Sequence, residues 1–112
     1  MGAKPIGSFG KYEHKTHSVP TAVRRAVQEG LRLRDKYRRG GTDVGVARAR
    51  QLATGSPKVT TRDLVYMRAY FARHAVDFRP GWDELATPGY IAWMLWGGDA
   101  GRDWAERILR AG

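Results

Sequence analysis

The chain has 112 residues, of which 42% are hydrophobic and 11% aromatic, with four tryptophans and no cysteine. This composition is too rich in apolar side chains for a disordered chain, and the length suits one domain with a single core. It excludes disulfides and thiolate metal sites, and no apolar run approaches the roughly 18 residues of a membrane helix. We therefore expect one folded domain with no membrane segment and no secretion leader.

The charge balance is strongly basic, with 20 Lys and Arg against 11 Asp and Glu, which gives a formal net charge of +9. The excess lies ahead of the tryptophan-rich segment from 80 to 112, where acids outnumber bases. A basic body with a slightly acidic, aromatic end favours one surface that faces a polyanion, nucleic acid foremost. The alternative is that the arginines only keep helices solvated.

Residues 1 to 17 contain three glycines and a proline and show no periodicity, which predicts an extended or flexible basic arm ahead of a single helical domain from 18 to 112. Its lysines, Lys4, Lys11 and Lys15, are candidates for contact with a phosphate backbone. The alternative is a disordered terminus. His14 and His17 have a spacing that suits a metal, but no third histidine is near, so no metal is predicted.

The first helix is predicted from Ser18, its candidate N-cap, to Arg39, before the Gly40 and Gly41 stop. At 100° per residue one arc is apolar: Val23, Ala26, Val27, Gly30, Leu31, Leu33 and Tyr37. The opposite side is a cationic strip: Arg24, Arg25, Arg32, Lys36 and Arg39. A solvated helix usually mixes signs to gain (i, i+4) pairs, so this strip favours an anionic partner.

Two more helices are predicted from 43 to 53 and from 61 to 75, separated by the turn formers of 54 to 57. Thr42 and Thr60 are their candidate N-caps. This arrangement is typical of a helix-turn-helix pair, and equally of many structural corners. Arg48 and Arg50 lie two residues apart and cannot both face a binding surface. Arg48 is taken as the candidate, and the other is expected to pair with an acid or to cover the core.

The helix from 61 to 75 has the clearest pattern. Its inward stripe is Leu64, Met67, Phe71 and Ala75, flanked by Val65, Tyr70 and Ala72. Its outward face holds Arg62, Tyr66, Ala69 and Arg73. Arginines on either side of an exposed tyrosine suit contacts to phosphates and bases, as in recognition helices. The alternative is a solvated face that happens to hold a tyrosine, and His74 is expected to be structural.

After a loop from 77 to 87, Thr87 is predicted to cap a helix with Pro88 at its first position. Residues 90 to 96 are apolar on every side and are expected in the interior, which favours packing over base stacking for the tryptophans. Asp99 is the predicted N-cap of a last helix. The fold class is therefore all-α, a compact bundle of about five short helices with a helix-turn-helix-like pair and a basic arm.

Three blocks carry a resemblance: RGGTDVGVARARQL at 39 to 52, YFARHAVD at 70 to 77 and GYIAWMLWGGDAGRDWA at 89 to 105. In them the chain resembles a small, largely uncharacterised domain of tailed bacteriophages, found alone or beside head-morphogenesis genes such as the maturation protease. The resemblance spans roughly residues 20 to 105 and implies a phage setting. It implies no catalytic residues in this chain, because none are assigned to the family. Phe78 stands where a lysine is usual, so any contact by that lysine is lost, and Thr87 with Pro88 replaces a Pro-Ser pair.

The sequence holds no phosphate-binding glycine loop, nucleophile elbow, HExxH motif or acidic cluster for Mg²⁺. The leading hypothesis is a non-catalytic phage protein that binds nucleic acid mainly through phosphates and without a cofactor, with DNA favoured and RNA as the alternative. One alternative is a virion or head-assembly protein whose basic face meets packaged DNA or a capsid partner. Another is a host-directed inhibitor of an acidic host protein. All place the chain in the host cytoplasm or the virion.

Overall fold

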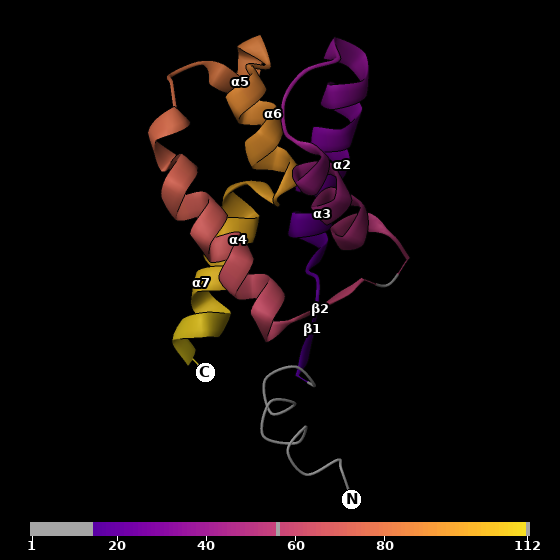
Figure 1. Ribbon diagram of the computed structural model, residues 1–112, viewed down its shortest axis with the longest axis vertical. Coiled ribbons are helices and arrows are strands. Elements are labelled where there is room, and N and C mark those ends of the chain that lie inside the picture. Colours follow the sequence, from indigo (N-terminus) through magenta and orange to yellow (C-terminus); the bar gives the residue numbers. More distant parts are fainter. Residues whose placement is uncertain (1–14, 56, 112) are drawn as a thin grey trace, which may run out of the picture.

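A computed structural model of the chain describes residues 15 to 55 and 57 to 111 (Figure 1). This part of the chain forms six α-helices, a 3-10 turn and two short strands. In order they are β1 (Thr16–Ser18), α2 (Thr21–Tyr37), α3 (Asp43–Ala53), β2 (Lys58–Thr60), α4 (Thr61–His74), η1 (Ala75–Asp77), α5 (Trp82–Leu85), α6 (Pro88–Leu95) and α7 (Gly98–Ala111). The predicted all-α class is confirmed.

Helix α2 is central to the packing, because it contacts α3, α6 and α7, whereas α4 packs mainly on α7. In Figure 1, α4 and α7 lie on the left, α2 and α3 on the right, and α6 between them. At Gly30 the helices α2 and α6 nearly touch, since a Cβ there would lie 2.8 Å from the backbone nitrogen of Leu95. The helices of the predicted helix-turn-helix-like pair, α3 and α4, therefore pack mainly on other elements rather than on each other.

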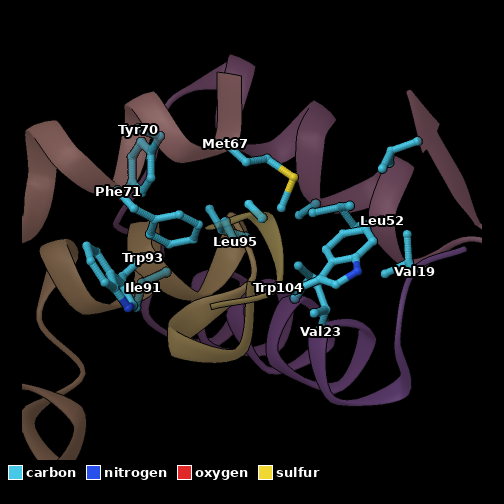
Figure 2. Close-up of a cluster of buried hydrophobic side chains, with 14 of the residues drawn as sticks. Val19, Val23, Leu52, Met67, Tyr70, Phe71, Ile91, Trp93, Leu95 and Trp104 are labelled. Atoms are coloured by element: carbon cyan, nitrogen blue, oxygen red, sulfur yellow. The ribbon is translucent and has the colours of Figure 1, made fainter. Parts of the chain in front are cut away.

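The hydrophobic core collects side chains from α2, α3, β2, α4, α5, α6 and α7, together with Val19 between β1 and α2 (Figure 2). Trp82, Trp93 and Trp104 are buried, and Phe71 meets Trp93 edge-on with ring centroids 4.7 Å apart. Burial of such large rings is the main source of stability in a domain of this size. The expectation that the tryptophans pack in the interior is confirmed for these three, whereas Trp96 is half-buried.

Local signals placed three of the helices correctly. The side chain of Thr42 accepts a hydrogen bond from the backbone of Gly45, and Thr60 forms a reciprocal capping box with Asp63. Thr87 accepts one from the backbone of Tyr90, with proline at the first helical position of α6. Each cap satisfies amide groups that a helix start leaves without partners.

The predicted N-cap Ser18 is wrong, because α2 begins at Thr21. Ser18 belongs to β1, which pairs antiparallel with β2 so that His17 faces Val59 and Ser18 faces Lys58. The strand also crosses the predicted boundary between the arm and the domain at residues 17 and 18. Three-residue strands carry no periodic signal of their own, so their pairing was invisible in the sequence.

Two other local predictions are wrong at helix ends. Tyr37, placed on the inner arc of the first helix, is 42% exposed and is the last residue of α2. Asp99 is not an N-cap, since it lies inside the first turn of α7, where its carboxylate accepts a hydrogen bond of 2.9 Å from the indole nitrogen of Trp93. The predicted loop from 77 to 87 begins at the last residue of η1 and contains the short helix α5.

Candidate nucleic-acid interface

The cationic strip predicted on α2 is only partly available. Arg25 and Lys36 are exposed, whereas Arg24 is half-buried with its Nε enclosed by protein. Arg32 is exposed but donates to both carboxylate oxygens of Glu29, at 2.8 and 2.6 Å. These hydrogen bonds from Arg32 hold the pKa of Glu29 below its ordinary value. The strip therefore offers two cations that the protein leaves largely unengaged.

Arg39 does not belong to the helical strip, which corrects its predicted position. It follows the end of α2 and donates to the carbonyl oxygens of Leu85 at 3.0 Å and Ala86 at 2.9 and 3.1 Å. These carbonyls end α5, and the last carbonyls of a helix lack partners within it. Arg39 also lies 5.3 Å from the ring centre of Tyr37. Its guanidinium therefore links the end of α2 to the end of α5 by hydrogen bonds.

Arg48 is held by three groups of the protein. It donates to Asp63 at 2.8 Å and to Gln51 at 2.6 Å, and its guanidinium lies 5.4 Å from the ring centre of Trp96. The arginine side chain is 13% exposed and that of Asp63 20%. Arg50 is the exposed one of the two arginines, the reverse of the predicted assignment.

The environment of Asp63 shows how this contact acts. Burial alone would raise the pKa of Asp63, but the hydrogen bonds from Arg48 and Thr60 outweigh it and leave the pKa below its ordinary value. The charged carboxylate thus joins the start of α4 to α3 while completing the capping box of α4. Arg48 serves the fold at this junction.

Three of the four outward positions predicted for α4 are confirmed, whereas Ala69 is half-buried. Arg62, Tyr66 and Arg73 are exposed, and the tyrosine has 54% of its surface open. Neither arginine forms an ion pair within residues 15 to 55 and 57 to 111. Arg68 is exposed as well, although it is not among the contact residues predicted from the sequence.

A groove of about 780 Å³ runs between the start of α3, the α4 helix and α6. The α4 wall consists of Tyr66, Ala69, Tyr70, Arg73 and His74. These residues recur at helical spacing on a face next to the buried stripe. The groove therefore brings together three of the predicted contact residues, Arg48, Tyr66 and Arg73.

Stacked rings form one side of this groove. Tyr70 stacks on Trp96 with centroids 4.5 Å apart and an interplanar angle of 6°, and it stacks on His74 at 4.5 Å. Arg48 covers Trp96, and His74 Nδ1 lies 2.9 Å from a carboxylate oxygen of Asp77. Burial raises the pKa of the Tyr70 hydroxyl above its ordinary value. In the sequence, the (i, i+4) spacing of Tyr70 and His74 is the pattern that indicates this stack of rings.

A second groove, of about 710 Å³, lies where α2, α5, α6 and α7 meet. Trp82, Tyr90 and Trp93 line it, and Asp83 and Asp99 are exposed in its wall. The two carboxylates make this groove less suited to a phosphate than the first one.

The remaining predicted contacts fall in the arm. Lys4 and Lys11 lie outside the described residues, and Lys15 is exposed directly before β1. The ring nitrogen Nε2 of His17 lies 2.9 Å from the hydroxyl of Thr61. Within the described ranges no group of three histidine or acidic side chains is placed to hold a metal ion. None of the helices described is long and apolar enough to cross a membrane.

The two basic surfaces lie apart. Figure 1 places α4 on the left of the molecule and α2 on the right beside α3, with α6 between the two sides. A partner that follows the face of α4 would therefore have to extend across the molecule to reach the α2 strip. No family model, curated protein or solved structure matches the chain, so the site rests on its own geometry.

Proposed function

We propose that the protein binds nucleic acid without catalysing a reaction, with the outer face of α4 as the main contact surface. The observation that carries this proposal is the alignment of Arg62, Tyr66 and Arg73 on one exposed helix face beside the groove. Arginines without carboxylate partners are available to phosphates, and an exposed tyrosine offers a ring to a base. Arg25 and Lys36 on α2 add a second, phosphate-directed area.

The proposal includes a phage setting, which the resemblance of the sequence implies, and DNA as the favoured nucleic acid. With a net charge of +9, long-range attraction to any polyanion speeds the encounter. Phosphate contacts carry no sequence information, so the binding we propose is largely independent of sequence.

The test is a mobility-shift titration of the whole chain with DNA at two salt concentrations. The double variant Arg62→Ala with Arg73→Ala should bind more weakly. The slope of its log affinity against log salt concentration should be smaller in magnitude by about 0.9 for each phosphate contact removed. Its matched control is Arg107→Ala with Arg110→Ala, which removes the same charge from exposed positions of α7. The control should bind nearly as the unaltered protein does.

Thermal melts of both double variants separate binding from folding. Exposed arginines without partners contribute little to stability, so both variants should melt within a few degrees of the parent protein. Absence of any shift at low salt in the parent protein would refute nucleic-acid binding. A large drop in melting temperature for the α4 variant would mean that these arginines support the fold.

A second candidate function is a virion or head-assembly role with a protein partner. It is favoured by Val76, Phe78 and Leu85, three large apolar side chains exposed within one ten-residue segment around η1 and α5. Exposed apolar groups of this kind are common at protein interfaces. The discriminating observation is stoichiometric recovery of the protein in purified particles, and its absence from them would count against this role.

A further inference from the structure

The groove between α3, α4 and α6 has features that a phosphate contact alone does not need. We propose that it takes one unstacked nucleotide, with the base inside the groove and a phosphate at Arg73. This inference rests on the proposed function and adds a substrate class, a single strand rather than a duplex.

The size and lining of the groove suit a nucleotide. Its volume of about 780 Å³ lies in the range of small-molecule sites, which run from about 300 to 1,000 Å³. Ala69 on α4 and Gly89 and Ala92 on α6 leave space between the walls. A planar base needs a flat, largely apolar slot of this kind, with few polar groups to orient it.

The rings beside the groove offer two different surfaces. Tyr70 lines the groove and is stacked on Trp96 and on His74, so its faces are occupied and its edge is the part left for a ligand. The hydroxyl of this groove-lining tyrosine makes no hydrogen bond among the described residues. An edge of this kind can hydrogen-bond the edge of a base, whereas the exposed ring of Tyr66 at the rim can stack on its face.

The charges around the groove favour an anion at one end. Asp77 is the acid in the described lining, and His74 contacts its carboxylate. The charge of Arg48 is balanced by Asp63. Arg73 remains without an ion pair in the described part of the chain, and Arg62 lies about 16 Å away along the same helix, at 1.5 Å per residue. A strand that follows α4 would meet both arginines, with the groove between them.

A duplex does not fit this arrangement as well. A paired base has both faces stacked and its edge occupied, so it would have to be extruded to enter the groove. A base in a single strand pays less for leaving its stack. The site therefore discriminates between strand types through the cost of exposing a base.

The experiment uses the whole chain, a short fluorescent oligo(dT), a duplex of the same length, and free thymidine monophosphate. The matched variants are Ala69→Glu, which fills and charges the groove wall, and Ala72→Glu, which makes the same change on an exposed position of α4 outside the lining. Ala69→Glu should weaken oligo(dT) binding by roughly tenfold or more, the scale of one lost base contact, and Ala72→Glu by about twofold or less. If Ala69→Glu fails to fold by circular dichroism, Ala69→Gln and Ala72→Gln replace the pair.

Each outcome has a distinct meaning. Preference for oligo(dT) over the duplex together with selective weakening by Ala69→Glu supports the inference. If thymidine monophosphate also binds and Ala69→Glu abolishes its binding, the site accepts a free nucleotide as well as a strand. Equal binding of strand and duplex, with both variants weakened alike, overturns the inference and leaves the proposed function in place. No binding of either nucleic acid at low salt overturns the proposed function itself.

Discussion

Replacing Arg48 with alanine separates a residue that supports the fold from one that contacts a ligand. The arginine donates to Asp63 and Gln51 and covers Trp96, so its removal breaks the link between α3 and α4 and uncovers the indole. A half-buried carboxylate would remain without its cation. We expect Arg48→Ala to destabilise the domain while the outer face of α4 stays intact.

The expected loss is about 2 to 3 kcal/mol. Removing one partner of a fully buried pair costs about 3 to 5 kcal/mol, and an exposed pair contributes about 1 kcal/mol or less. With side chains 13% and 20% exposed, the pair of Arg48 and Asp63 lies between these limits, at about 2 kcal/mol. The cation over Trp96 adds about 0.5 to 1 kcal/mol. For a domain of this size the melting temperature should fall by about 10 °C.

The assay is urea and thermal unfolding followed by circular dichroism, with Arg50→Ala as the control. Arg50 is exposed on the same helix and carries the same charge, so its loss should change stability by about 0.5 kcal/mol or less. A double-mutant cycle with Asp63→Asn should give a coupling of about 1 to 2 kcal/mol. If Arg48→Ala melts like Arg50→Ala yet loses nucleic-acid binding, Arg48 is a contact residue and this reasoning is refuted.

Three further outcomes follow from the packing and the charges. Gly30→Ala should destabilise the protein by about 1 to 3 kcal/mol in urea unfolding, because the added Cβ would press on the α6 backbone. Gly89→Ala is the control, because its Cβ would meet only ordinary contacts of 3.5 Å or more, and it should be neutral or stabilising. Because the pKa of Asp63 is lowered in the folded protein, its charged carboxylate stabilises the fold fully above the ordinary pKa of about 4, and this contribution is lost as pH falls through the lowered value. The urea midpoint of the parent protein should therefore drop in acid, and that of Asp63→Asn should drop less. Asp99→Ala should cost about 1 kcal/mol in the same assay by leaving the indole of Trp93 without its acceptor, and Asp99→Asn should cost less.

Three helix starts were predictable because their signals are local. Thr42, the pair of Thr60 and Asp63, and Thr87 each act within a few residues of their own helix, and short-range hydrogen bonds need no tertiary partner. The strands were not predictable for the opposite reason. Thr16 pairs with Thr60 far along the chain, and three residues hold too little pattern to indicate a strand.

The candidate site shows the same division. The outward face of α4 follows from helical spacing alone, so Arg62, Tyr66 and Arg73 were placed correctly. The choice between Arg48 and Arg50 depends on where α4 lies relative to α3, and helical spacing says nothing about that. The groove requires three helices to meet, so the sequence could indicate its residues but not their convergence.

The net charge of +9 overstates the surface available to a polyanion, because several cations are engaged by the chain itself. Arg32 pairs with Glu29, Arg39 holds the end of α5, and Arg48 joins α3 to α4. Removing Arg39 or Arg48 should therefore change stability first, whereas removing Arg62 or Arg73 should change binding first. Measuring unfolding and binding on the same variants separates these two roles, which a count of basic residues treats as one.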